Sequence, residues 1–236
     1  MVELDGRRLE DALPGRQGRL LFGYLAVNRG RPVGRAALAE VLWPDGSGAG
    51  SEGRLRPLLS KLRHVVGEDR LEGRSEMRLQ LPGHASVDVE SARAGVHDAE
   101  SAIAQERWEE AWLPARVAWS VTSREFMAGH EGDWIDEARR ELAQLHVRAL
   151  ECIARTGLEL SGAELPAAER AARSLVKLAP YRESGYRCLM EALERRSNVA
   201  EALRVYEEAR CLLRDELGVT PGAELAALHT RLVGKA

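Results

Sequence analysis

The chain has 236 residues, of which 44% are hydrophobic and 30% are charged, and its formal net charge is −3 at pH 7. This composition predicts a folded protein of one or two domains with a real core. No run of about 18 apolar residues occurs, and the first 30 residues lack the apolar stretch of a signal peptide, so we expect a cytoplasmic protein that does not bind a membrane.

The charges are distributed unevenly along the chain. Residues 1–85 carry 14 Lys and Arg against 11 Asp and Glu, a net charge of +3, while residues 86–236 carry 20 against 26, a net charge of −6. Phosphate contacts supply most of the non-specific affinity of proteins for DNA, and an excess of three cations is small for that purpose. A role in nucleic-acid binding therefore depends on a local cluster of cations.

The N-terminal part combines short strands with helices. The stretch VELDGRRLE (2–10) predicts two strands that meet at Asp5-Gly6. Apolar residues at helical spacing predict one helix over 16–27 and a second over 35–42, each followed by residues that end a helix.

A third helix is predicted by six apolar residues that recur at steps of three and four: Leu55, Leu58, Leu59, Leu62, Val65 and Val66. Proline costs about 3 kcal/mol inside a helix but is tolerated in the first turn. Because of Pro57, we predict that this helix begins near Arg54 or Leu55 and that residues 46–53 form a loop.

The segment RLEGRSEMRLQL (70–81) predicts a hairpin across Gly73 to Glu76, with Arg74 near its tip. Three helices followed by a hairpin is the order of a winged helix-turn-helix. The side of the third helix opposite its leucines is polar and basic, and recognition helices place such residues in the major groove. The predicted DNA-binding residues are Arg56, Ser60, Arg63 and His64 on this side, Arg54 and Lys61 at one edge of it, Arg16 and Arg19 on the first helix, and Arg74 on the wing.

Within this set we expect Arg16 and Arg19 to contact phosphates from the first helix, and Arg74 to enter the minor groove from the wing. The alternative interpretation is an ordinary packed helix with a solvated basic face.

After about residue 88 the pattern is almost entirely helical and carries a period of 34 residues. Small and large residues alternate at the offsets of a tetratricopeptide repeat, because close helix crossings need small side chains. The residues that carry this pattern are Ala168, Ala172, Leu175, Pro180, Tyr186, Leu189, Leu193, Ala202, Tyr206 and Ala209. The predicted fold class is therefore mainly α, with an N-terminal winged helix-turn-helix (α+β) followed by an all-α TPR-like helical repeat domain.

Other site chemistry is weakly supported. Trp112, Trp119 and Trp134 fit packing between helices better than an aromatic ligand pocket, which remains the alternative. The three cysteines and six histidines lack metal-ligand spacing, and no phosphate-binding or nucleophile-elbow motif occurs. We expect no cofactor, no metal and no enzymatic activity.

Several stretches resemble the Streptomyces antibiotic regulatory protein (SARP) family. They are LPGRQGRLLFGYLAVNRGRPVGRAALAEVLWP, LRPLLSKLRHVVG, DWIDEARRELAQLHVRALE and YRESGYRCLMEALERRSNVAEALRVYEEARCLLRDELGVTP. The resemblance implies an OmpR-like winged helix over residues 1–87 and a TPR-like bacterial transcriptional activator domain over residues 88–236. Three features depart from the family: a shorter N-terminal sheet, Gly34 in place of a Ser or Thr helix cap, and Pro57.

The resemblance also implies a function. Such proteins bind promoter repeats in double-stranded DNA and help to recruit RNA polymerase. We therefore expect a transcriptional activator that acts in antibiotic biosynthesis. A homodimer is one option for its oligomeric state. The alternative is a protein-interaction or ligand-sensing scaffold whose winged helix no longer binds DNA.

Overall fold

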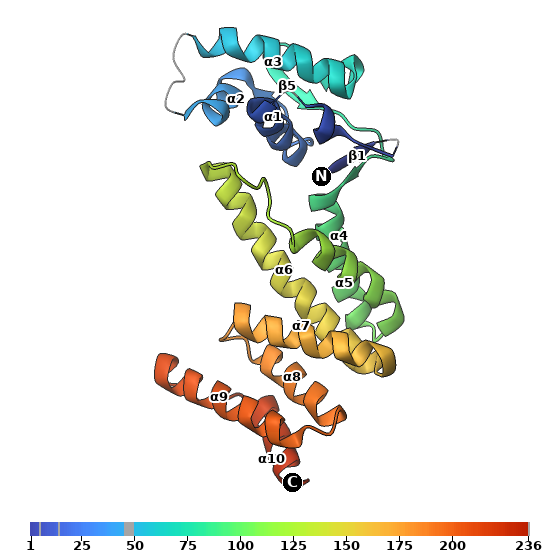
Figure 1. Ribbon diagram of the computed structural model, residues 1–236, viewed down its shortest axis with the longest axis vertical. Coiled ribbons are helices and arrows are strands. Elements are labelled where there is room, and N and C mark those ends of the chain that lie inside the picture. The colour runs from blue at the N-terminus through green and yellow to red at the C-terminus, as the bar shows by residue number, and fades with distance from the viewer. Residues whose placement is uncertain (5, 14, 45–49, 236) are drawn as a thin grey trace. The chain divides into compact units, whose positions relative to one another are not determined.

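The computed structural model describes residues 1–4, 6–13, 15–44 and 50–235, and its chain divides into two compact units (Figure 1). The first unit comprises residues 1–91 and 124–142, and the second comprises residues 92–123 and 143–236. The predicted domain boundary between residues 87 and 88 stays a prediction. The mainly helical fold class is confirmed. None of the helices in the described ranges is apolar over a length that would cross a bilayer.

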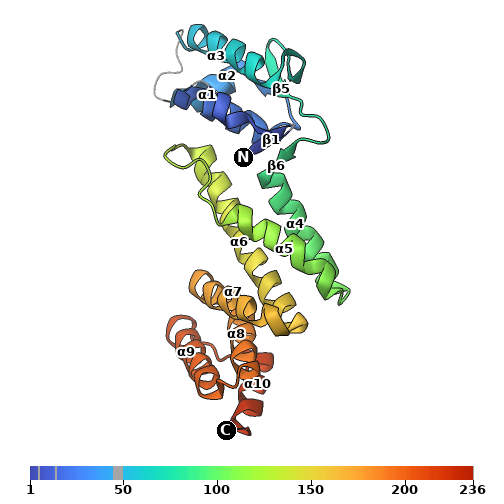
Figure 2. The ribbon, with the colours of Figure 1, turned by 45° about the vertical axis from the view of Figure 1, so that its right-hand side comes forward.

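Over its described residues up to 87, the first unit contains three α-helices and two small antiparallel sheets, in the predicted order of helix, helix, helix and hairpin. One sheet has the strand order β2-β1-β6 and the other β3-β5-β4. The elements are β1 (Val2–Leu4), β2 (Arg7–Arg8), η1 (Leu9–Ala12), α1 (Gly15–Val27), β3 (Val33–Gly34), α2 (Arg35–Leu42), α3 (Ser51–Val66), η3 (Glu68–Arg70), β4 (Leu71–Glu72), β5 (Glu76–Leu79) and β6 (Ser86–Val87). Figure 2 shows β6 leading into α4.

The predicted hairpins are both present. β1 pairs with β2 on either side of the predicted turn, of which Asp5 lies outside the described residues. β4 pairs with β5, and Gly73 between them has a φ of +100°. A Cβ at Gly73 would lie 1.8 Å from the carbonyl oxygen of Glu76, so the wing turn requires glycine.

The core of the first unit is a leucine-rich cluster beneath α3. Leu38 of α2, Leu55 and Leu62 of α3 and Met77 of β5 have 0% of their surface exposed. As predicted, Gly34 precedes α2 without a side-chain cap. Full burial of each such side chain contributes about 1.5–3 kcal/mol relative to exposure, so this cluster fixes which side of α3 faces inward.

The prediction that α3 begins near Arg54 or Leu55 is wrong, because α3 begins at Ser51 and contains Pro57 in its second turn. Of the predicted loop, residues 46–49 lie outside the described residues and residues 51–53 are helical. Proline has no N–H to donate to the carbonyl four residues earlier, which here belongs to Gly53. Gly53 is exposed, so solvent can supply a donor in place of the missing N–H.

The first turn of α3 is held by contacts that the proline does not disturb. Leu55 is fully buried, and Glu52 forms an ion pair with Arg35 of α2, with 2.9 Å between Oε1 and Nε. Because of the burial of Leu55 and this ion pair, the helix begins about one turn earlier than backbone propensity alone predicts.

A segment far along the sequence completes the first unit. Trp134 packs edge-on against Tyr24 of α1, with ring centroids 5.2 Å apart, and against Phe126 at 6.1 Å. A Cβ at Gly23 would lie 3.0 Å from the sulfur of Met127, so this segment packs closely against α1. Ile135 is fully buried in the same core. Trp134 is therefore a packing residue, as expected.

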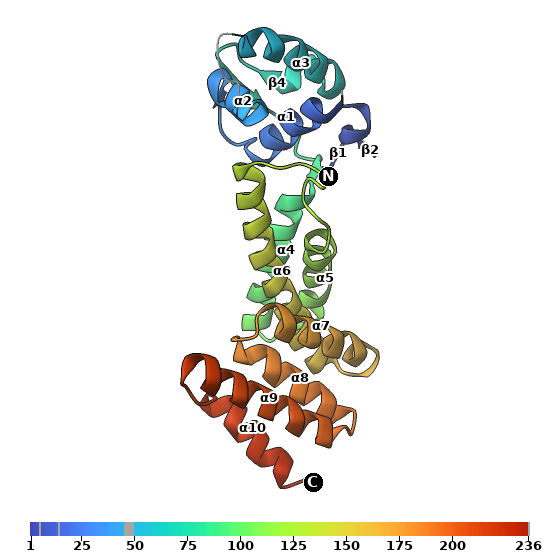
Figure 3. The ribbon, with the colours of Figure 1, turned by 60° about the vertical axis from the view of Figure 1, so that its left-hand side comes forward.

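Over its described residues, the second unit contains helices and their connections but no strands. Its elements are α4 (Asp88–Ala104), α5 (Trp108–Thr122), α6 (Asp133–Leu160), η4 (Gly162–Glu164), α7 (Leu165–Leu178), α8 (Glu183–Arg195), α9 (Val199–Leu217) and α10 (Ala223–Val233), of which α4 and α6 begin within the first unit. Helices α7 to α10 pack against one another in turn (Figure 3).

The predicted repeat pattern is confirmed by packing. Nine of the residues that carry it are buried: Ala168, Ala172, Leu175, Tyr186, Leu189, Leu193, Ala202, Tyr206 and Ala209. The three alanines at 168, 172 and 202 have no exposed surface, as close helix crossings require. The tenth, Pro180, follows the end of α7 at Leu178.

Replacing Pro57 with alanine should stabilise the first unit. The new N–H would donate to the Gly53 carbonyl, and we expect the free energy of unfolding to rise by about 2 kcal/mol in urea denaturation. Ser60→Ala on the same exposed side, where no backbone donor is gained, should change it by less than about 0.5 kcal/mol. A Pro57→Ala variant less stable than the parent would show that α3 needs the proline.

Candidate nucleic-acid interface

Helix α3 separates an apolar side from a polar, basic side. Of its six predicted core residues, Leu55, Leu59, Leu62 and Val66 are buried, and the other two are half-buried. On the opposite side, Arg56, Ser60 and His64 of the predicted DNA-binding set are exposed, and Arg54 and Lys61 are exposed at one edge of that side. Because α1 and α2 pack against α3 within this unit, the basic side faces away from them (Figure 1).

Arg63 is the one predicted contact on α3 that is partly buried, and it holds the wing. Its Nε donates to the carbonyl oxygen of Leu71 at 3.2 Å, and a terminal nitrogen donates to that of Gly73 at 2.9 Å. These bonds tie α3 to β4 and to the hairpin turn. Arg63 is therefore a positioning residue for the wing, in addition to its predicted role.

Arg35 was missed by the sequence analysis and performs a similar task. Besides its ion pair with Glu52, its Nη1 donates to the carbonyl oxygen of Arg74 at 3.3 Å, and its backbone N–H donates to that of Ser75 at 3.1 Å. Arg35 thus links the start of α2, the start of α3 and the wing. The sequence feature that could have indicated this role was an arginine directly after Gly34, which has no side chain to cap the helix.

A shallow pocket at the first half of α3 brings several of these groups together. It is lined by Arg35, Glu52, Gly53, Arg56, Leu59 and Arg63. Three guanidinium groups thus surround one carboxylate, and Glu52 is paired with Arg35. The local excess is positive, and Arg56 is the arginine of this group without an ion-pair or hydrogen-bond partner among the described residues.

The remaining predicted residues lie outside this pocket. Arg54 stacks its guanidinium 4.5 Å from the ring centroid of Trp43. Arg74 is exposed in the wing turn, and Arg16 and Arg19 are exposed on α1. Within the described ranges, no carboxylate lies within 4.0 Å of Arg16 or Arg19, so both cations remain open to an external anion.

Two of the three thiols are buried. Burial raises the pKa of both Cys152 and Cys188 to about 12, so both stay protonated at neutral pH and are poor nucleophiles. Among the described residues, no three His, Cys, Asp or Glu side chains lie close enough to hold a metal ion.

The chain combines a winged helix-turn-helix, whose third helix has a basic side, with helical repeats that follow it. This combination is typical of a class of two-part regulatory proteins. Residues 87–233 match the family described as bacterial transcriptional activator domain, and this chain belongs to that family. The resemblance to the SARP family is thereby confirmed.

Similarity to individual proteins extends over nearly the whole chain. Regulatory protein AfsR of Streptomyces griseus is 29% identical over 218 residues, which cover 92% of this chain and 22% of AfsR. Transcriptional regulatory protein EmbR of Mycobacterium tuberculosis (strain ATCC 25618 / H37Rv) is 26% identical over 249 residues, which cover 98% of this chain and 61% of EmbR. The chain therefore spans less than two thirds of either relative.

A solved structure shares the fold. The structure of Mycobacterium tuberculosis EmbR in complex with a low-affinity phosphopeptide has a TM-score of 0.73 and 24% sequence identity, over 93% of this chain and 59% of that one. This likeness supports the arrangement of helices and small sheets described above.

Removing the Arg63 side chain should loosen the wing. We expect Arg63→Ala to speed amide hydrogen exchange in residues 71–79 by about tenfold, because two hydrogen bonds from a charged donor are lost. Arg56→Ala, which removes an exposed guanidinium on the same helix, is the matched control and should leave exchange unchanged. Equal exchange in Arg63→Ala and the parent would contradict the positioning role.

Proposed function

We propose that this chain is a DNA-binding transcriptional regulator. Residues 1–87 would form the DNA-binding domain and residues 88–236 the activator domain. The observation that carries the proposal is the exposed basic side of α3, where Arg56 and His64 project opposite the buried leucines and Lys61 is exposed at the edge of that side. Membership of the bacterial transcriptional activator domain family supports it.

In this proposal α3 lies in the major groove. Arg56 has no competing partner among the described residues, so its guanidinium is available for bidentate hydrogen bonds to guanine O6 and N7. Ser60, Lys61 and His64 follow along the same side, while Arg16 and Arg19 contact phosphates. Arg74 reaches the minor groove from the wing, which Arg63 and Arg35 hold against the helix.

The helical repeats would carry the protein contacts. Residues 86–236 have a net charge of −6, which suits contact with proteins better than contact with phosphates. We propose RNA polymerase as the partner, promoter repeats as the target, and a second copy of the chain as the neighbour on adjacent repeats. Such a protein activates transcription in the cytoplasm, and its SARP-like sequence favours genes of antibiotic biosynthesis.

A second candidate is a scaffold that binds proteins or a small ligand but not DNA. Glu52 favours it, because this carboxylate is 73% exposed and stands on the proposed recognition surface. Selection of bound sequences from a random duplex pool distinguishes the two. An enriched sequence supports the regulator, and no enrichment even at low salt supports the scaffold.

Changing Arg56 to alanine should weaken binding to the selected duplex by about 5- to 100-fold and relax the preference at one base pair. Fluorescence anisotropy with the full chain measures the affinity. Arg155→Ala is the matched control, since Arg155 is an exposed arginine of α6. Full affinity and full specificity in Arg56→Ala would remove Arg56 from the interface.

The phosphate contacts have a different signature. The double variant Arg16→Ala, Arg19→Ala should reduce the slope of log K against log salt by about 2, because each phosphate contact contributes about 0.9. The preferred sequence should stay the same, since phosphate contacts carry no base information. A slope equal to that of the parent would show that α1 does not touch the backbone.

A further inference from the structure

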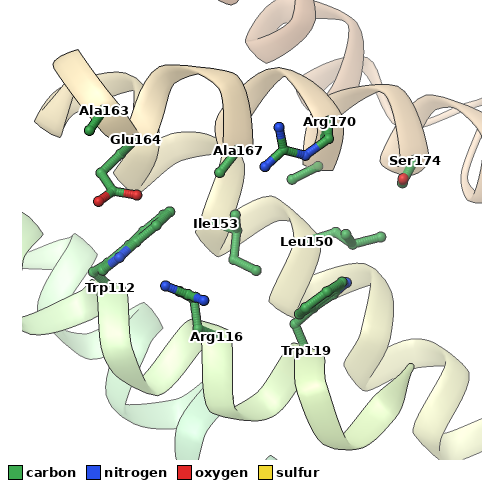
Figure 4. Close-up of a pocket in the computed structure, with 11 residues that line it drawn as sticks. Trp112, Arg116, Trp119, Leu150, Ile153, Ala163, Glu164, Ala167, Arg170 and Ser174 are labelled. Atoms are coloured by element: carbon green, nitrogen blue, oxygen red, sulfur yellow. The ribbon is translucent and has the colours of Figure 1, made fainter. Parts of the chain in front are cut away.

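The second unit contains a pocket that DNA binding does not use. It lies between α5 and η4–α7, with α6 as its floor, and encloses about 450 Å³ (Figure 4). Buried Leu150 and Ile153 of α6 form the apolar floor. Its volume is within the range of about 300–1,000 Å³ that small-molecule sites occupy.

One wall of the pocket is aromatic and the other is made of small residues. Trp112, Arg116 and Trp119 recur at i, i+4 and i+7, so they share one side of α5, and all three line the pocket. Trp119 is 41% exposed, whereas a tryptophan that only packs between helices is mostly buried. Across the space, Ala163 and Ala167 leave room in front of the two indoles.

Two guanidinium groups give the pocket its charge. Arg116 and Arg170 both line it, and neither has a carboxylate within 4.0 Å in the described part of the chain. Arg173, one turn further along α7, is instead paired with Glu169 and Glu201. The arginines of the pocket thus keep unused donors, whereas a neighbouring arginine on the same helix does not.

The opposite end of the pocket carries a carboxylate. Glu164 lies above Trp112 and forms no ion pair among the described residues. A ligand with a second anionic group at this end would be repelled, while a hydroxyl or amino group would find an acceptor. The pocket is therefore complementary to one negative charge, a flat apolar body and a neutral polar tip.

We propose that this pocket binds a small planar aromatic monoanion. The ring system rests on Ile153 between Trp112 and Trp119, where the partly exposed Trp119 offers aromatic surface and Ile153 offers apolar surface. The Arg116 guanidinium lies over the Trp112 ring, 5.8 Å from its centroid, so the cation stands at the edge of this space. The carboxylate or sulfonate accepts hydrogen bonds from Arg116 and Arg170, whose fixed donor forks match a planar anion. In this proposal Trp112 and Trp119 form a ligand site, which the sequence analysis kept as the alternative to packing between helices.

Two fluorescent probes that differ in charge test this proposal with the full chain. 8-Anilinonaphthalene-1-sulfonate carries one negative charge, and N-phenyl-1-naphthylamine has the same ring system without it. We expect the anionic probe to bind at least about tenfold more tightly, because the two arginines contribute only to its binding. Arg116→Gln and Arg170→Gln should each weaken the anionic probe about fivefold and leave the neutral probe unchanged.

Filling the pocket should abolish binding of both probes. Ala167→Phe places a ring in the space, and thermal melting followed by circular dichroism verifies that the variant folds. Trp119→Leu removes a partly exposed side chain and serves as the second variant should Ala167→Phe misfold. Arg155→Gln is the matched control, because Arg155 is an exposed arginine of α6 outside this pocket, and it should leave both affinities unchanged.

The proposal is overturned if both probes bind equally well, or if a folded Ala167→Phe or Trp119→Leu variant binds the anionic probe as the parent does. Absence of binding by the anionic probe overturns it too. None of these outcomes depends on the winged helix, so they leave the proposal of DNA binding unaffected.

Discussion

Burial of the leucine side of α3 is the interaction on which the proposed function depends. Leu55, Leu59 and Leu62 pack into the core with Leu38, and the contribution of each, about 1.5–3 kcal/mol, leaves only one rotation of the helix compatible with a closed core. That rotation directs Arg56 and Lys61 outward. The basic side is thus a consequence of packing, and its side chains are exposed.

Cations around α3 divide into two groups by their partners. Arg35 and Arg63 donate to backbone oxygens of the wing and keep helix and hairpin together. Arg56 has no such partner among the described residues, and Lys61 is exposed further along the same helix. Arginine therefore has a structural role at positions 35 and 63, whereas at position 56 its hydrogen-bond donors are exposed. Loss of binding on mutating Arg63 would consequently not demonstrate a DNA contact by itself.

Local patterns predicted α2 over 35–42 with its observed bounds, because a short amphipathic helix between Gly34 and Pro44 depends on neighbouring residues alone. Local patterns failed to predict features that depend on contacts between residues far apart in the sequence. Burial of Leu55 and the pairing of Glu52 with Arg35 start α3 earlier than Pro57 suggests. Trp134 was predicted as a packing residue, but its place against Tyr24 depends on a contact across more than a hundred residues that no periodicity encodes. The roles of Arg35 and Arg63 likewise depend on tertiary hydrogen bonds.

The basic side of α3 contains one of the chain's three lysines, which are Lys61, Lys177 and Lys235. Acetylation of the lysines, followed by mass spectrometry with and without a selected duplex, therefore tests the central claim directly. The account predicts that DNA protects Lys61 and leaves Lys177, exposed on α7, fully reactive. Equal acetylation of Lys61 with and without bound DNA would contradict it.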